Sequence, residues 1–325
     1  MYDIITIGDA LIDTHVHIDN AALECDLMKK NCQLCLNYGG KIPIVDSFQC
    51  LGGNAPNVSA GTAKLGLKTA IIGAVGNDSN GEVVVEKLKQ YNIDTKFIQI
   101  DKQNQTRYSV VLNFKGERTI LSYSQKKDYV WPKNLPETKW LYYTSLSQGF
   151  EKIHGDLKKY LTNHSQTKLA LNPGSYMIKY ATKYLRDAIK KCDLVIVNKE
   201  EAEKILNIKK SKSIVNLIIG LLKMGAKEVA ITDGEHGAWA GDKKTIWKMK
   251  SFPVKPIAKT GAGDAFSSAY LAAKIMGKEI PQALNWGIAN SCSVILEVGA
   301  QNGLLDKIGI EKLLKKYKNI QPIKI

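Results

Sequence analysis

The chain has 325 residues, is 44% hydrophobic and carries a formal net charge of +15, so it can bury one large core or one core with a small appendage. Lysine supplies nearly all of the positive charge, since arginine occurs only three times and the lysines are scattered, which argues against a nucleic-acid surface built on arginine. No apolar run approaches the roughly 20 residues that cross a bilayer, and no signal peptide is evident, so we expect a cytoplasmic protein without membrane or nucleic-acid partners.

The first predicted element is a buried strand at residues 3–7, a β-branched run closed by Gly8. Shortly after it, His15, His17 and Asp19 alternate along the chain, which places them on one face of an extended strand. Such a face suits a metal ion, but no further ligand lies close by in the sequence. An exposed polar strand face is the better interpretation.

Residues 20–40 form a polar insertion before a strand that we predict at residues 41–49. Four of the six cysteines lie in or beside this insertion, and two of them form a C-x-x-C pair: Cys25, Cys32, Cys35 and Cys50. That spacing is compatible with zinc, but no second C-x-x-C follows, and a cytoplasmic protein keeps its thiols reduced. We therefore predict reduced thiols and no stoichiometric zinc, with metal binding by these four cysteines as the open alternative.

A glycine turn at residues 52–54 leads into a small-residue helix that ends near Leu65. Beyond it, strand and helix patterns alternate, and a hairpin turns at Lys115-Gly116. This alternation is typical of an α/β domain with a mainly parallel sheet. We predict a helix at residues 82–91 and strands at residues 69–76, 97–100, 107–113, 117–123, 140–144, 169–172, 194–197 and 229–232.

Polar residues follow two of the later strands. Asn198 opens a helix directly after the strand at 194–197, with Glu201 one turn into it, on the side where ligands of α/β sheets bind. Glu201 can hold magnesium through water molecules, although acidic residues are also common at helix N-termini because of the helix dipole. A glycine-containing turn at residues 233–237 follows the strand at 229–232.

The most informative stretch lies near the start of the last quarter of the chain. A proline-containing extended segment runs into Gly261-Ala262-Gly263-Asp264, and residues 265–276 have a helical pattern. Amides at a helix N-terminus form an anion site, and glycine lets an anion approach the backbone closely. The Asp264 carboxylate would repel that anion unless it accepts a proton from an attacking hydroxyl while the amides stabilise developing phosphoryl charge. A plain glycine turn before an acidic helix residue is the alternative.

The stretch from Thr260 to Phe266 resembles the second signature of the ribokinase-like (PfkB) family of sugar and nucleoside kinases. Residues 52–60 resemble the first signature of that family, and Asn198 and Glu201 match its N-x-x-E pattern. The resemblance extends over nearly the whole chain. It implies a single three-layer α/β/α ribokinase-like domain over residues 1–325, with a central mainly parallel sheet and a small β lid from about 14–50 and 106–125.

The resemblance implies an ATP-dependent phosphotransferase that phosphorylates a hydroxymethyl group of a sugar, as a ribokinase or fructokinase does. A nucleoside kinase is the alternative, and a non-catalytic sugar- or nucleotide-binding protein on the same fold is a weaker one. The implied cofactors are ATP and magnesium, the latter held by Glu201 through water. The expected partners are the small-molecule acceptor and ATP, and a homodimer formed through the lid is a further expectation.

The same resemblance assigns roles to individual residues. Asp264 is the expected general base, beside an anion hole formed by Gly261, Ala262 and Gly263. The expected acceptor-binding residues are Asp13, Gly52, Gly53 and Asn57. The expected ATP-binding residues are Asn198, Thr232, Gly234, Gly237 and Asn290.

The chain departs from the family pattern, which opens Asp-Thr-x-Gly-Ala-Gly-Asp, at Ala258 and Lys259. Many family members bind potassium beside the anion hole, and the aspartate of the pattern helps to hold it. Ala258 removes that carboxylate, and Lys259 adds a positive charge to the same loop. We therefore expect the dependence on a monovalent cation to be weak or absent.

Overall fold

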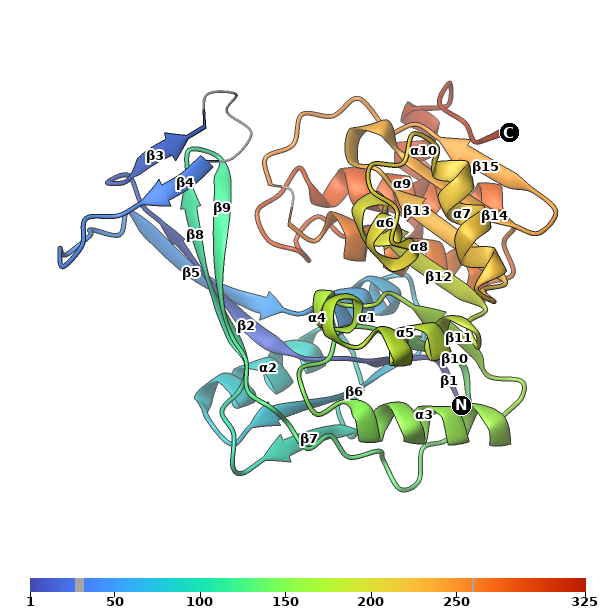
Figure 1. The fold of residues 1–325 in the computed structure, drawn as a ribbon, viewed down its shortest axis with the longest axis horizontal. Coiled ribbons are helices and arrows are strands. Elements are labelled where there is room, and N and C mark those ends of the chain that lie inside the picture. The colour runs from blue at the N-terminus through green and yellow to red at the C-terminus, as the bar shows by residue number, and fades with distance from the viewer. Residues whose placement is uncertain (27–31, 259) are drawn as a thin grey trace.

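The computed structural model describes residues 1–26, 32–258 and 260–325 and consists of an α/β body from which a small β lid projects (Figure 1). The described strands of the body form one sheet in the order β16-β15-β14-β13-β12-β11-β10-β1-β6-β7. The seven neighbouring strands from β13 to β7 in this order run parallel to one another. β14 pairs antiparallel with β13, β15 with β14, and β16 with β15. The strands are β1 (Tyr2–Ile7), β6 (Thr69–Gly76), β7 (Ile98–Asp101), β10 (Thr138–Tyr143), β11 (Lys168–Leu171), β12 (Leu194–Asn198), β13 (Glu228–Thr232), β14 (Ala238–Asp242), β15 (Ile246–Met249) and β16 (Ile323–Lys324).

Helices cover both faces of this sheet (Figure 1). They are α1 (Asn54–Lys64), α2 (Ser79–Gln90), α3 (Glu151–Asn163), α4 (Ser175–Tyr180), α5 (Thr182–Ile189), α6 (Lys199–Leu206), α7 (Ile214–Lys223), α8 (Ala262–Ile275), α9 (Ile280–Val294) and α10 (Lys307–Lys316). Among the helices of the described residues, none is both long and apolar enough to cross a bilayer.

The two faces of the sheet have separate hydrophobic cores. Ile5 and Ile7 of β1 pack with residues of α3, α5 and α7, whereas Ile4 packs with residues of α8 and α9. Successive strand residues point to opposite faces, so a strand covered on both faces has a continuous apolar sequence. The predicted α/β/α architecture with a mainly parallel sheet is confirmed.

The lid is a second sheet, with its described strands in the order β5-β2-β8-β9. The turn between β8 and β9 uses Lys115 and Gly116, whose φ angles are 49° and 81°, as a two-residue hairpin turn requires. β5 begins at Asp46 and not at residue 41 as predicted, because Pro43 has no N–H group to contribute to a strand ladder. The lid strands are β2 (Leu11–His17), β5 (Asp46–Gly52), β8 (Tyr108–Phe114) and β9 (Glu117–Tyr123), and a small hairpin of β3 (Ala22–Cys25) and β4 (Cys32–Cys35) lies beyond them.

The prediction that all the cysteines are reduced is wrong, because Cys25 and Cys32 form a disulfide. These two residues are directly opposite each other in the β3–β4 ladder, which brings their side chains together. Cys32 and Cys35, the predicted C-x-x-C pair, are three residues apart on one strand and therefore point to opposite faces. Cys35 and Cys50 are free and half-buried. Within the described ranges, no group of three or more His, Cys, Asp or Glu residues is arranged to hold a metal ion.

Candidate active site

α8 begins at the glycine turn that the sequence singled out. Gly261 is its N-cap residue with a φ of 79°, in the left-handed region that glycine adopts most easily. A Cβ atom at this position would lie 2.5 Å from the Cβ of Ala300. The helix starts at Ala262, three residues before the predicted start, so Gly263 and Asp264 belong to its first turn. The amides of this turn are among the N–H groups that make a helix N-terminus an anion site.

The Asp264 carboxylate is bonded to a side chain from α1. Nδ2 of Asn57 donates to Oδ2 of Asp264 over 2.8 Å. Oδ1 of Asn57 in turn accepts from Nε2 of Gln301, which also donates to the carbonyl oxygen of Leu51 over 2.8 Å. These bonds fix the amide of Asn57 with its NH₂ group toward the carboxylate. Asn57, which we expected to bind the acceptor, is therefore placed to position Asp264.

Asp264 has an unusual protonation equilibrium for an aspartate. Burial raises the pKa of Asp264 to about 7, and the Glu201 carboxylate adds to the rise, whereas hydrogen bonds with Asn57 and Asn54 oppose it. Desolvation and a neighbouring like charge both disfavour the ionised carboxylate. The pKa of Asp264 therefore lies near neutral pH, where a general base is most effective.

A pocket of about 230 Å³ opens in front of Asp264. Its lining comes from distant parts of the chain: the glycine turn and first turn of α8, the carboxyl ends of β12 and β13, and the lid strand β9. This is the edge of a parallel sheet at which α/β proteins bind ligands. The predicted site residues that line it are Gly261, Ala262, Gly263, Asp264, Asn198, Glu201 and Thr232.

The N-x-x-E pattern forms a capping box at the start of α6. Oδ1 of Asn198 accepts from the amide of Glu201 over 2.8 Å, and Oε2 of Glu201 accepts from the amide of Asn198 over 2.9 Å. Burial raises the pKa of Glu201, while its bond to the Asn198 backbone lowers it. The other carboxylate oxygen of Glu201, Oε1, has no hydrogen bond to the described residues. Glu201 lines the pocket in front of Asp264.

The other residues expected to bind the nucleotide lie outside this lining. Gly234 begins a short 3₁₀ turn after β13 (Gly234–His236) and Gly237 follows it, with φ angles of 53° and 97°. Asn290 is fully buried, donates to the carbonyl oxygen of Ala265 over 2.8 Å and accepts from the amide of Leu305 over 2.8 Å. Asn290 therefore joins α9 to α8 and to the segment before α10. These contacts occupy its side-chain amide within the protein, and a role for Asn290 in binding the nucleotide stays a prediction.

The expected acceptor-binding residues meet where β2 and β5 join the body. Gly53 is the N-cap of α1 with a φ of 99°, which lets the chain turn sharply from β5 into the helix. Asp13 on β2 lies against Gly52, leaving no space there for a Cβ atom. Burial raises the pKa of Asp13, whereas a hydrogen bond with Ser109 lowers it. Asp13 is half-buried.

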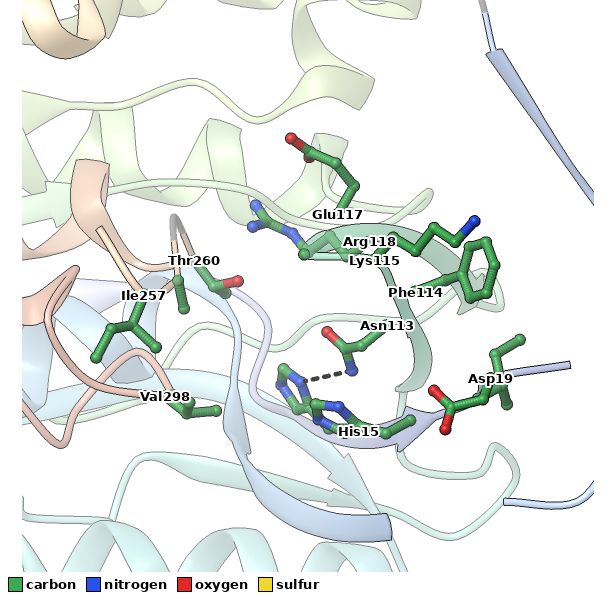
Figure 2. Close-up of a pocket in the computed structure, with 15 residues that line it drawn as sticks. His15, Asp19, Asn113, Phe114, Lys115, Glu117, Arg118, Ile257, Thr260 and Val298 are labelled. Carbon is green, nitrogen blue, oxygen red and sulfur yellow. Dashed lines mark hydrogen bonds between the residues drawn. The ribbon is translucent and has the colours of Figure 1, made fainter. Parts of the chain in front are cut away.

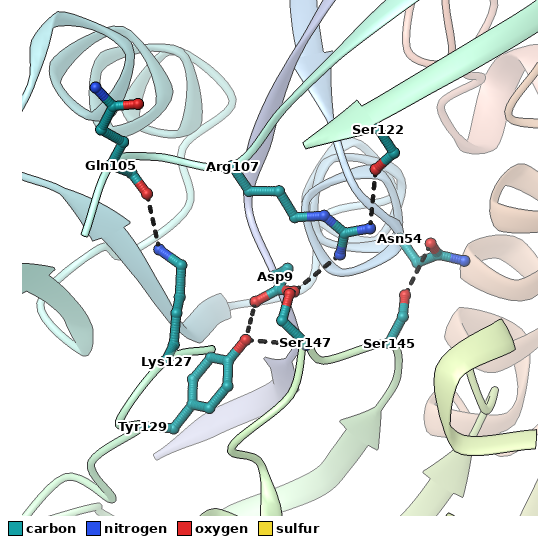
Figure 3. A network of polar contacts seen from close by, with 9 residues as sticks. All are labelled: Asp9, Asn54, Gln105, Arg107, Ser122, Lys127, Tyr129, Ser145 and Ser147. Atoms are coloured by element: carbon teal, nitrogen blue, oxygen red, sulfur yellow. Dashed lines mark hydrogen bonds and ion pairs between the residues drawn. The ribbon is translucent and has the colours of Figure 1, made fainter. Parts of the chain in front are cut away.

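A buried polar network that was not predicted from the sequence lies beneath the lid (Figure 3). Asp9, at the end of β1, accepts hydrogen bonds from Nη1 of Arg107 over 2.9 Å, Oη of Tyr129 over 2.5 Å and Oγ of Ser147 over 2.6 Å. Arg107 directly precedes β8 and also reaches Ser122 of β9 over 3.5 Å. Three donors satisfy the buried carboxylate, so the network ties the base of the lid to the body.

Arg118 of β9 is a second residue that sequence reasoning missed. It lines the pocket in front of Asp264 and also a neighbouring pocket under the lid, and Figure 2 shows it near Thr260 of the glycine turn. It makes no hydrogen bond or ion pair with the described residues. The only signal in the sequence was its rarity, as one of three arginines.

The substitutions in the family pattern fall beside this site. The amide of Ala258 donates to the carbonyl oxygen of Ile295 over 3.2 Å. Lys259, on which the expectation for potassium partly rests, lies outside the described residues.

A family model described as pfkB family carbohydrate kinase matches residues 17–307. The chain therefore belongs to the PfkB family and is a carbohydrate kinase. It is similar to an ATP-dependent 6-phosphofructokinase of Thermoanaerobacterium thermosaccharolyticum, 24% identical over 97% of this chain and 94% of the relative. It is also similar to a ribokinase of Bacillus subtilis, 25% identical over 85% of this chain and 92% of the relative. A 5-dehydro-2-deoxygluconokinase of Halalkalibacterium halodurans is 25% identical over 98% of this chain and 96% of the relative.

Solved structures share the fold. The ribokinase of Arabidopsis thaliana, complexed with ribose and ATP, superposes with a TM-score of 0.80 at 19% identity and covers 97% of this chain and 99% of its own. A ribokinase II candidate from Escherichia coli, in complex with ATP and magnesium, gives a TM-score of 0.76 at 19% identity over 98% of this chain and 100% of its own. The family resemblance seen in the sequence is confirmed, together with the ribokinase fold.

Proposed function

We propose that this kinase transfers the γ-phosphoryl group of ATP to a hydroxymethyl group of a sugar, with Asp264 as general base. The observation that carries the proposal is the position of Asp264, which has a pKa of about 7 and lies in the first turn of α8 beside the glycine amides. A carboxylate at that place can take a proton at neutral pH next to a site that attracts phosphoryl oxygens.

The proposed step balances as an in-line displacement. The acceptor oxygen loses its proton to the carboxylate of Asp264 and forms a bond to the γ-phosphorus, while the bond from that phosphorus to the bridging oxygen of ADP breaks. Charge on the transferring group is stabilised by the amides of Gly261, Ala262 and Gly263. Asn57 holds the carboxylate in one orientation through the 2.8 Å bond.

ATP as the phosphoryl donor is supported by the ATP complexes of the ribokinase-fold neighbours and by the pocket itself. Thr232 and Asn198 line it at the ends of β13 and β12. Magnesium fits the unbonded oxygen of Glu201, because this ion is commonly held by one or two carboxylates and several waters. When bound, magnesium would neutralise charge on the phosphates.

A nucleoside acceptor is the second candidate. Tyr108 and Tyr123, the aromatic pair of the lid, would be the natural stacking partners of a base. Their rings are stacked on each other across β8 and β9 with centroids 5.0 Å apart. Each ring covers one face of the other, so a base could stack only on an outer face of the pair.

The proposal is tested by measuring ADP release with a panel of sugars and nucleosides, after thermal-shift screening for binders in the presence of an ATP analogue. Asp264→Asn should lower kcat by at least about 100-fold while nucleotide affinity stays nearly unchanged. Asp128→Asn is the matched control and should leave kcat unchanged, because Asp128 is exposed and does not line the pocket in front of Asp264. A variant at position 264 that keeps more than about a tenth of the wild-type kcat would exclude Asp264 as the base.

A further inference from the structure

A second pocket, of about 180 Å³, lies under the lid (Figure 2). One wall is formed by the end of β2 and the β8–β9 turn, and the other by Ile257, Ala258, Thr260, Val298 and Gly299 of the body. Arg118 lines this pocket and also the pocket in front of Asp264. The two pockets therefore meet at the Arg118 side chain.

His15 lines this pocket from β2. It follows Asp13 by two residues, so the two side chains lie on the same strand face with their Cα atoms about 6.6 Å apart, a length that one sugar can span. His15 is only 3% exposed, and its ring is stacked on Phe48 with centroids 4.6 Å apart. The strand face that carries Asp13 thus continues into the second pocket.

The imidazole of His15 has one nitrogen without a partner. Nδ1 lies 3.5 Å from Nδ2 of Asn113, and the NH₂ group of Asn113 can only donate, so Nδ1 accepts and the hydrogen is on Nε2. Nε2 is buried and has no hydrogen-bond partner among the described residues. A buried donor without an acceptor is costly, and a bound group that supplies an acceptor would remove this cost.

The lining of the pocket carries both polar and charged groups. Asn113 and Thr260 are half-buried polar residues of the lining, and Arg118 has no ion pair with the described residues. Arg118, Asp19 and Glu117 are all exposed, so water screens the guanidinium and the two carboxylates alike. A guanidinium and an imidazole N–H together suit an oxyanion.

We propose that the second pocket is the far end of the acceptor site and binds an oxyanion of the acceptor, a carboxylate or a phosphate, through Nε2–H of His15 and the guanidinium of Arg118. This inference rests on the proposed function, because it places the reacting hydroxyl at Asp264 and the anion under the lid. The acceptor class is then an anionic sugar, either a sugar acid or a sugar phosphate. A neutral sugar can offer His15 only a hydroxyl oxygen and leaves the charge of Arg118 without a counter-charge, so it should bind more weakly.

The test is calorimetric binding of two matched sets of ligands, each with an ATP analogue. One set is a neutral aldohexose with the corresponding aldonate and 2-keto acid, and the other is a neutral ketohexose with its 6-phosphate, which keeps a free hydroxymethyl group at C1. One of the anionic ligands should bind at least about tenfold more tightly than the neutral hexose of its set. His15→Phe keeps the ring that stacks on Phe48 but removes the N–H group, and it should abolish this difference. His15→Gln restores a donor and should recover part of it, whereas Thr14→Val, on the opposite strand face, should leave it intact.

Equal binding of neutral and anionic ligands, or no binding of any anionic ligand, would overturn the inference. So would an equal loss for all ligands in His15→Phe. Selective binding of an anionic sugar that is never phosphorylated would support the second pocket and refute the proposed kinase step. Transfer to a neutral sugar without any anion preference would refute only the second pocket. Comparing the carboxylate arm with the phosphate arm identifies the source of the oxyanion.

Discussion

The side chains of Asn57 and Asp264 are joined by a 2.8 Å hydrogen bond although they are 207 residues apart in the chain. The bond links the first turn of α1 to the first turn of α8. Because Asn57 donates to the carboxylate, it favours the ionised form of Asp264 and partly opposes the effect of burial on its pKa. One side chain thus sets both the orientation and the basicity of the proposed base.

The first prediction concerns the pH dependence of the reaction. Asp264 accepts a proton only when it is ionised, and its pKa is about 7. The value of kcat/KM should therefore fall about tenfold per pH unit below neutrality and level off above it. Steady-state rates between about pH 5 and pH 9 measure this profile. A flat profile down to about pH 5 would mean that the base is another group or that its pKa is not raised.

The second prediction concerns Asn57→Leu. Loss of the donated hydrogen bond removes an effect that lowers the pKa of Asp264, so the acid limb of the pH profile should move to higher pH. The kcat value at neutral pH should fall by about tenfold. A purely structural role for Asn57 would lower stability without moving the limb. Thr62→Val, elsewhere on α1, is a control that changes a buried polar group without touching the carboxylate.

The sequence predicted those parts of the fold that depend on local pattern. The predicted strand at residues 69–76 coincides with β6, because a buried parallel strand is a continuous apolar run. The helix start at the Gly261 turn was placed within three residues, because glycine marks a backbone conformation that other residues rarely adopt. Both signals are contained within a few consecutive residues.

The parts that the sequence did not predict depend on contacts between distant residues. Asp9 directly follows the strand-closing Gly8, yet its partners are Arg107, Tyr129 and Ser147, which no spacing rule connects to it. Asn290 was assigned to the nucleotide because its segment resembles one of the family. Only the packing of α9 against α8 shows that its amide is occupied.

The third prediction separates the two glycines of the anion site. Gly261→Ala places a Cβ atom 2.5 Å from that of Ala300 at a φ of 79°, so it should lower the free energy of unfolding by about 1–3 kcal/mol and reduce kcat. Gly263→Ala meets no atom within 4 Å and should leave stability unchanged or slightly raised. Urea unfolding of both variants measures the difference. Equal stabilities would show that the turn adjusts to the added methyl group.

The fourth prediction concerns the disulfide. With Cys25 and Cys32 paired and the other four cysteines free, a thiol reagent should titrate four groups in the denatured, unreduced protein and six after reduction. In the Cys25→Ser/Cys32→Ser double variant it should titrate four in both cases. Six reactive thiols in unreduced protein purified without reductant would contradict the pairing. Activity should survive reduction, because none of the described residues of β3 and β4 lines either pocket.

The last prediction concerns the cost in stability of keeping a carboxylate at position 264. The folded-state pKa of Asp264 is about 7, raised from an ordinary value of 3.8, so the folded protein binds this proton more tightly than the unfolded chain does. Stability from this group is therefore fully present below about pH 3.8 and is lost as the pH rises toward 7, because ionisation is then easier in the unfolded chain.

Asp264→Asn removes that ionisation and the repulsion from Glu201 while keeping an oxygen that can accept from Asn57. The variant should melt at least about 2 °C above the wild type near pH 8, and the gap should close near pH 4. Asp128→Asn, a substitution at an exposed surface residue, is the control and should leave the melting temperature nearly unchanged at both pH values. Differential scanning calorimetry at the two pH values measures the effect. A variant that melts below the wild type near pH 8 would mean that the ionised carboxylate is stabilised in the fold, and the assignment of Asp264 as a base with a raised pKa would fail with it.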